Sequence, residues 1–266
     1  LHSDDIALFA PTLKTWNRLF ELSGNARGTI DNLVTKNMLI KSGNTIVDGD
    51  ITLSGLPDIT TTFIDFKSRD LRTTHTDLLT LIPSLKKVTQ PQLSKLGTIT
   101  FKGNYTGFIN DFVAYGSIGT NLGTINVDIN MKLPAKGTPI YSGKISTTSF
   151  NLSSFLNTKT LGNISVNGKI KGKGFTAKDV LLNFDGTINQ VQLLNYNYQN
   201  LIVKGTLDKK LFKGNFSIND PNLMVEDAVG IIDFNENNSK LNLDGFIRKA
   251  DLKKLNITND EFIVKG

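Results

Sequence analysis

The side chains that most often carry chemistry in proteins are scarce in this sequence. Its 266 residues include two histidines, His2 and His75, and no cysteine. The two histidines lie far apart and lack partners at metal-ligand spacing, so we interpret both as solvated residues. Without cysteine there is neither a disulfide framework nor thiolate chemistry. We therefore expect no metal site and no cofactor.

Sequence motifs for phosphate binding and nucleophilic catalysis are also missing. The chain has no Gly-x-Ser-x-Gly elbow, phosphate loop or metal-binding helix signature. The stretch Gly172–Phe175 resembles part of a nucleotide loop, but it lacks the following glycine and the helix that would bind phosphate. The paired acids Asp4 and Asp5 are typical of the start of a helix. We predict that the protein is not an enzyme and has no catalytic residues.

Lysine side chains follow a regular spacing in one segment. Lys169, Lys171 and Lys173 alternate with Ile170 and Gly172, so they would share one face of a strand. Two interpretations are open: a solvated face that also protects against edge pairing, or a guide for anionic lipid head groups beside a groove. Aromatic residues do not interleave with the basic ones and the net charge is a mild +6, so we expect no nucleic-acid partner.

Amphipathic strands are the elements that would position the lysines and the apolar residues between them. Between Ile125 and Leu133 every second residue is apolar and the residues between them are polar, and several other stretches repeat this period of two. With 39% hydrophobic and 20% charged residues the chain is able to form a core. No apolar run reaches the roughly 18 residues of a membrane span. The sequence predicts a mainly β fold with short connecting helices.

Short helical patterns recur between the strands and suggest an internal repeat. The first two run from a possible N-cap aspartate to a terminating proline, Pro11 or Pro83. The four patterns start at Asp5, Asp77, Asn151 and Asp251. We infer approximate units 1–76, 77–150 and 151–250, a fourth unit starting at 251, and an extra hairpin around Asp208–Lys210. This quasi-repeat favours an elongated array, one continuous segment (1–266) of a longer protein, and a β-sandwich is the alternative.

Glycines fall at apolar positions of the strand-like stretches. Gly103 and Gly107, for example, have the same parity as Ile99 and Phe101. Glycine in a strand marks a bend, a bulge or a close approach, and it costs roughly 0.5–1 kcal/mol relative to alanine. The pattern predicts a sharply curved sheet, with either an open gutter or a filled interior in which glycine relieves crowding. The glycines expected on this face are Gly49, Gly55, Gly103, Gly107, Gly168, Gly172, Gly205, Gly214 and Gly245.

The same parity identifies the side chains that would form an apolar wall beside these glycines. They belong to segments that alternate between apolar and polar residues, so we expect them to share one face in each strand. The expected wall residues are Val47, Ile51, Leu53, Ile99, Phe101, Tyr105, Ile125, Val127, Ile129, Met131, Ile164, Val166, Ile170, Leu201, Val203, Phe212, Phe216, Ile218, Leu241 and Leu243.

Three ordered sets of segments carry a resemblance to a known family. They are Gly55–Asp58 with Thr62–Asp65, then Thr106–Gly116 with Gly123–Ile125 and Asp128–Asn130, and finally Asn197–Leu201 with Asp220–Leu223 and Gly230–Phe234. Together they resemble the TamB branch of the AsmA-like proteins, in the form carried by Bacteroidota. The likeness covers nearly the whole chain, although no single motif is diagnostic. The composition, rich in Asn, Lys and Ile, is similar to that of such bacteria.

The resemblance implies a fold, a location and partners. It implies a β-taco, a long sheet folded along its length with an apolar groove inside. Proteins of this family lie in the periplasm, anchored in the inner membrane, and their C-terminal part meets an Omp85-type outer-membrane barrel such as TamA. They are implicated in outer-membrane biogenesis. This chain would be part of the middle, with the inner-membrane anchor outside it.

Three functions follow as hypotheses. In the first, the chain is a conduit in which phospholipid acyl chains lie against the apolar wall, shielded from water at about 0.8 kcal/mol per methylene. In the second, it is a scaffold or chaperone that lends a sheet edge to outer-membrane proteins by β-augmentation. In the third, it is a rigid spacer with a closed core. The sequence leaves these three open.

Overall fold

The fold of this chain is almost entirely antiparallel β-sheet. The structure is a computed structural model that describes residues 1–7, 17–81, 85–86, 88–234 and 240–265. Strands account for 66% of the chain and helices for 8%, which confirms the mainly β prediction. The chain divides into two units, residues 1–136 and 137–266, and each is described by itself. Among the described residues no helix is both long and apolar enough to cross a membrane.

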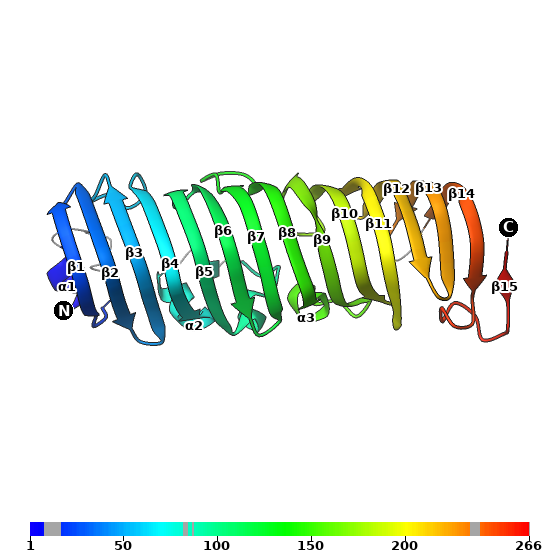
Figure 1. The fold of residues 1–266 in the computed structure, drawn as a ribbon, viewed down its shortest axis with the longest axis horizontal. Coiled ribbons are helices and arrows are strands. Elements are labelled where there is room, and N and C mark those ends of the chain that lie inside the picture. Colours follow the sequence, from blue (N-terminus) through cyan, green and yellow to red (C-terminus); the bar gives the residue numbers. More distant parts are fainter. Residues whose placement is uncertain (8–16, 82–84, 87, 235–239, 266) are drawn as a thin grey trace. The chain divides into compact units, whose positions relative to one another are not determined.

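The first unit is a meander of seven strands with short helical segments between them (Figure 1). Each strand pairs antiparallel with the next strand in the sequence, from β1 to β7. The elements are α1 (Ser3–Ile6), β1 (Glu21–Thr29), β2 (Asn32–Ser42), β3 (Thr45–Ser54), β4 (Phe63–Thr74), α2 (His75–Leu81), η3 (Leu93–Leu96), β5 (Thr98–Phe108), β6 (Asp111–Thr120) and β7 (Gly123–Lys132).

The second unit repeats this plan with longer strands. Its strands also pair antiparallel in sequence order. The extra hairpin predicted around Asp208–Lys210 is the turn between β11 and β12. The elements are β8 (Ile140–Asn151), α3 (Leu152–Leu156), β9 (Leu161–Lys173), β10 (Leu181–Leu193), β11 (Tyr196–Asp208), β12 (Leu211–Asp220), β13 (Leu223–Asp233), β14 (Lys240–Asp251) and β15 (Ile263–Val264).

Short helices begin near the sequence positions where the repeat pattern places them. Asn151 is the N-cap of α3, and its side chain accepts a hydrogen bond from the Ser154 N–H at 2.8 Å. Asp251 accepts one from the Lys254 N–H at 3.2 Å, although the chain there forms a turn and not a helix. Asp77 lies inside the first turn of α2 and not before it. The expected terminating residues Pro11 and Pro83 lie outside the described residues.

The first helix corrects two sequence predictions. Asp5 is not its N-cap: His2 takes that position, and the half-exposed imidazole, which we expected to be merely solvated, accepts a hydrogen bond from the Asp4 N–H at 3.3 Å. The Asp5 carboxylate in turn accepts from the His2 N–H at 2.8 Å, which completes a capping box. Asp4 and Asp5 therefore lie in the first turn, as expected for acids at a helix start.

A row of small residues crosses the sheet of the first unit. Gly49 lies opposite Ser68, Ser68 opposite Gly103, and Gly103 opposite Gly116. At Gly103 and Gly116 φ is +151° in both cases, a value that residues with a Cβ rarely adopt. A Cβ added at Gly103 would overlap the Tyr115 carbonyl oxygen, and one at Gly116 would overlap the Lys102 carbonyl oxygen. Close approach of neighbouring backbones therefore requires glycine at these two positions.

We predict that Gly103→Ala destabilises the first unit by about 2–3 kcal/mol, because it adds backbone strain and a clash with a main-chain atom. Native-state hydrogen exchange of the β5 and β6 amides measures the loss directly. Gly119→Ala on β6 is the matched control, since its nearest neighbour is the Thr100 hydroxyl, which is able to rotate away. Equal losses in the two variants would show that the glycine row has no special backbone requirement.

Candidate functional site

The candidate site in the first unit is one apolar face of its sheet. Residues that lie opposite each other in neighbouring strands point to the same face, so the strand register assigns every side chain. The register from β3 to β7 produces three apolar rows at right angles to the strands. The rows are Val47–Leu71–Phe101–Ile118–Ile125, Ile51–Phe66–Tyr105–Ala114–Ile129 and Leu53–Ile64–Gly107–Phe112–Met131.

The second unit has a corresponding apolar face. Its rows run from β8 or β9 to β13 or β14, and glycines again line up across strands. Three of the rows are Thr147–Val166–Ile188–Leu201–Ile218–Val225, Ile145–Gly168–Gly186–Val203–Phe216–Ala228 and Ile170–Phe184–Gly205–Gly214–Gly230–Leu243. A fourth is Tyr141–Gly172–Leu182–Leu207–Phe212–Ile232.

The predicted wall residues fall on these two faces, with a few differences at the ends. Gly55 lies outside the strands, in the bend after β3, where φ is +108° and its N–H donates to the Asp31 carbonyl at 2.8 Å. Leu243 and Gly245 lie on β14 and are exposed. The side chain of Leu241 is outside the described part of the structure. Parity therefore groups the wall residues within each unit, whereas Gly55 lies beyond the end of its strand and Leu243 and Gly245 are exposed on β14.

Most of the wall residues are neither buried nor fully exposed. Val127 and Val166 are buried, with 8% and 7% of their surface exposed, whereas Ile125, Ile129 and Ile170 are half-buried. Only ten apolar residues are buried among the residues that the structure describes. In β7 each apolar residue is less exposed than its polar neighbours such as Asp128. Each face thus remains partly accessible, as a surface that receives an apolar ligand must be.

Aromatic rings occupy the space above several of the glycines. A Cβ at Gly168 would meet the Phe184 ring at 2.6 Å. One at Gly49 would meet the Phe66 ring at the same distance and would also overlap the Lys67 carbonyl oxygen. Such rings shield the glycine backbone in a strand and pack in place of the missing side chain. At these positions glycine relieves crowding. At Gly103 and Gly116 the neighbouring atoms belong instead to the backbone.

Several wall residues were absent from the predicted set. Phe112, Ala114 and Ile118 of β6 alternate with Val113 and polar residues, and this parity was available in the sequence. Phe66, Phe184, Ile188 and Ile232 were also missed. Their segments contain bulges or short apolar pairs, so only the cross-strand register assigns their face.

Tyr105 is the one wall residue of the first unit with a polar end. Its ring stacks on Phe112, with 4.7 Å between the centroids, and its hydroxyl donates to the Phe108 carbonyl at 2.8 Å. Burial raises the pKa of Tyr105 to about 12. The hydroxyl is therefore neutral at physiological pH, and the wall gains no charge there.

An ion pair between the buried Asp77 and the half-buried Arg18 stabilises one end of the first sheet. Asp77, with 4% of its surface exposed, accepts hydrogen bonds from Arg18 Nη2 at 2.7 Å and from the Asn44 N–H at 3.1 Å. The Thr74 hydroxyl donates to the same carboxylate at 3.2 Å. Burial by itself would raise the pKa of Asp77, but hydrogen bonding and the charge of Arg18 outweigh it, so the pKa is lowered. This carboxylate joins α2, the β2–β3 turn and the segment before β1.

In the second unit, another buried carboxylate joins separate segments of the chain by hydrogen bonds. Asp220 is fully buried and accepts from the Tyr196 hydroxyl at 2.5 Å, from the Gln199 N–H at 3.1 Å and from the Asn222 N–H at 2.8 Å. Burial, followed by the Asp220 hydrogen bond, raises the pKa of Tyr196 to about 12. The carboxylate connects the start of β11 to the β12–β13 turn, two of the segments that carry the family resemblance.

Within the described ranges, no group of three or more His, Cys, Asp or Glu residues is placed to hold a metal ion. Comparison with protein-family models, with curated proteins and with solved structures gives no match to this chain. The arrangement of the faces themselves is therefore the basis for a functional proposal.

We predict that Asp77→Asn destabilises the first unit by about 2–3 kcal/mol at neutral pH, because it removes the charge that compensates half-buried Arg18. A carboxylate with a lowered folded-state pKa stabilises the fold above its unfolded pKa of about 3.9, and it loses that contribution as pH falls through the folded value. Urea unfolding between pH 7 and pH 3 should therefore show wild type and variant converging at the acid end. Asp128→Asn, on the exposed face of β7, makes the same charge change and should leave stability nearly unaltered across this range. A constant difference from pH 7 to pH 3 would contradict this account.

Proposed function

We propose that this chain is a segment of a TamB/AsmA-like periplasmic protein and carries phospholipid along its apolar faces, in support of outer-membrane biogenesis. The single observation that carries the proposal is the alignment of partly accessible apolar residues in rows across the strands. The rows cross β3 to β7 at about 4.8 Å per strand, so each row extends over roughly 19 Å. An acyl chain lying along a row stays in contact with apolar side chains throughout.

The mechanism is solvation of the acyl chain and involves no bond making. Each methylene that the wall shields from water contributes about 0.8 kcal/mol. Because Phe101, Ile118 and Ile125 follow one another at similar spacing, an acyl chain meets similar surroundings at each step along the row. A uniform surface binds the acyl chain without a deep free-energy minimum at any one position. Direction and energy come from outside this segment, as do the membrane anchor and the contact with an Omp85-type barrel.

The proposal predicts that a photo-crosslinker at position 129 captures phospholipid in cells and that one at position 130 does not. Ile129 lies on the apolar face, and Asn130 is its neighbour on the polar face of the same strand. Mass spectrometry of the crosslinked adducts identifies the lipid. Equal capture at the two positions would show that the apolar face has no selective contact with lipid.

A charge on the wall tests whether that contact supports function. With the photo-crosslinker moved to position 125 on the same apolar face, Ile129→Asp should lower lipid capture by on the order of tenfold, the equivalent of losing contact with about two methylenes. Asn130→Asp introduces the same carboxylate on the opposite face and should have little effect. Ile129 is a better position than Val127, since Val127 is buried and its replacement endangers the fold. Circular dichroism of both variants verifies that the sheet is retained.

A scaffold for outer-membrane protein assembly is the second candidate, and the strand at one edge favours it. All nine residues of β1 are exposed, and in the described structure β1 pairs with β2 alone. Such an edge is able to receive another strand by β-augmentation. If the probe at position 129 captures polypeptide, and Ile129→Asp leaves function intact, the scaffold replaces the conduit. Capture of neither lipid nor polypeptide would leave a rigid spacer.

A further inference from the structure

The polar face of the second unit carries a cluster of lysines. Lys169, Lys171 and Lys173 share this face, as their spacing predicts, because their register partners in β10 include Asn183 and Asp185. Lys144 of β8 lies directly opposite Lys169 and joins the cluster. Neighbouring strands are about 4.8 Å apart, so like charges meet side by side here. We name Lys144, Lys169, Lys171 and Lys173 the lysine cluster.

Some strand lysines in the described structure form ion pairs and the members of the lysine cluster do not, although Asp185 lies directly opposite Lys169 in the register. Lys204 forms an ion pair with Asp185 at 3.2 Å and Lys132 forms one with Asp111 at 3.1 Å. In the described part of the chain no ion pair involves a member of the lysine cluster. Like charges directly opposite in a sheet destabilise it. An external anion would offset this repulsion.

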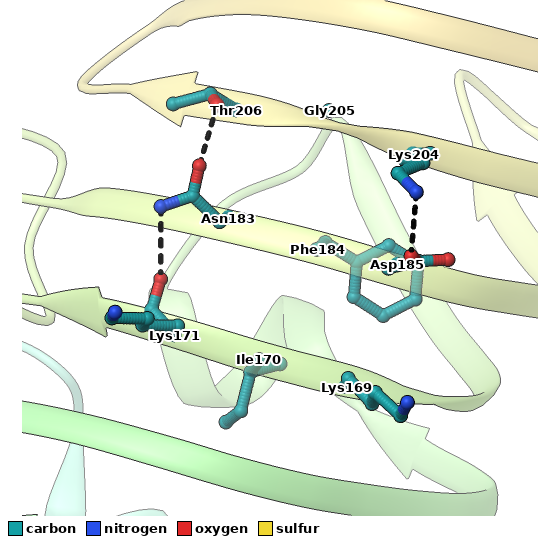
Figure 2. Close-up of a pocket in the computed structure, with 9 residues that line it drawn as sticks. All are labelled: Lys169, Ile170, Lys171, Asn183, Phe184, Asp185, Lys204, Gly205 and Thr206. Atoms are coloured by element: carbon teal, nitrogen blue, oxygen red, sulfur yellow. Dashed lines mark hydrogen bonds and ion pairs between the residues drawn. The ribbon is translucent and has the colours of Figure 1, made fainter.

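A shallow depression beside the lysine cluster brings several cations together (Figure 2). It has a volume of 380 Å³, and Lys169, Lys171 and Lys204 are among the residues that line it. The Thr206 hydroxyl donates to Asn183 Oδ1 at 2.6 Å, and the Asn183 amide donates to the Lys171 carbonyl at 3.4 Å. These neutral groups satisfy one another. The ammonium groups of Lys169 and Lys171 therefore remain available for a ligand.

Apolar side chains flank the cations on the same face. Ile202 lies two residues from Lys204 on β11 and has 63% of its surface exposed. Ile140 lies directly opposite Lys173 and is 50% exposed. Cations next to exposed aliphatic side chains suit the boundary between phospholipid head groups and acyl chains. Asp185 is the nearest carboxylate in the register, and its pairing with Lys204 limits its repulsion of an anion.

We propose that the polar face of the second unit docks on an anionic phospholipid surface through the lysine cluster, with Ile140 and Ile202 contacting the lipid. This docking uses the face opposite to the apolar wall and does not rest on the conduit function. Lysine is a hydrated point charge on a flexible stem, which suits the mobile phosphates of a bilayer better than a fixed carboxylate pair. The lysine cluster includes no arginine fork for bidentate recognition of a protein carboxylate. It also lacks the interleaved aromatic rings on which nucleic-acid bases stack.

The test compares binding of the 266-residue chain to phosphatidylcholine vesicles with and without phosphatidylglycerol. Each lysine near an anionic surface contributes about fivefold in affinity, so K144Q/K169Q/K171Q should bind the mixed vesicles on the order of a hundredfold more weakly. K41Q/K67Q/K102Q removes three exposed strand lysines from the first unit and is the matched control. The control should bind like the unaltered chain, and binding of that chain should fall as salt screens the charges.

Three results would overturn the docking proposal. One is equal loss of binding in the two triple variants, which would reflect net charge alone. Another is equal binding of the unaltered chain to vesicles with and without phosphatidylglycerol. The last is cluster-dependent binding of an acidic peptide in place of the vesicles, which would make the partner a protein.

Because the three glutamines lie on the polar face, lipid capture by the probe at position 129 should persist in K144Q/K169Q/K171Q. Failure of docking is thereby separated from failure of the conduit.

Discussion

Alternation of side chains across the pleated strand is the constraint on which the rest of the structure depends. Because every second residue points to the same face, an antiparallel meander in register places the apolar residues of each strand opposite the apolar residues of the next. Phe101, Ile118 and Ile125 meet in this way although they come from three strands. A shift of one residue at any pairing would expose that strand's apolar side chains and bury its polar ones. The apolar and polar faces are therefore two results of one register.

Bulges, together with ion pairs beside them, fix the register where a strand bends. Between Ser68 and Leu71 the pairing of β4 with β5 shifts, and Arg69 in the bulge donates to Asp48 and Asp50 on the neighbouring strand. Hydrogen bonds from Asn37 and Lys36, with Arg69 contributing, lower the pKa of Asp50 to about 2, so that it stays ionised well into acid. These groups are exposed and each contributes little free energy. Their effect is geometric, because they fix the position at which an additional residue enters the sheet.

Parity in the sequence was enough to predict the strands and most of the wall. The stretch from Ile125 to Met131 alternates without interruption, and β7 has the predicted exposure at each position. Prediction failed where a non-local partner decides the outcome. Phe66 covers Gly49 from the next strand, and the carboxylate of Asp77 binds Arg18, 59 residues away. His2 caps α1, although histidine is not among the preferred capping residues. Such pairings depend on register and on chain reversals, which local periodicity does not encode.

The two faces of the second unit place opposite requirements on the same strands. β9 presents Val166 and Ile170 to one side and Lys169 and Lys171 to the other. A strand that is apolar on one face and cationic on the other is stable only while both faces have suitable surroundings. Water satisfies the exposed lysines, and it reaches the half-buried wall only in part. The two proposals therefore assign the faces separately, with acyl chains on the wall and lipid phosphates at the lysine cluster, and each face is tested by its own variants.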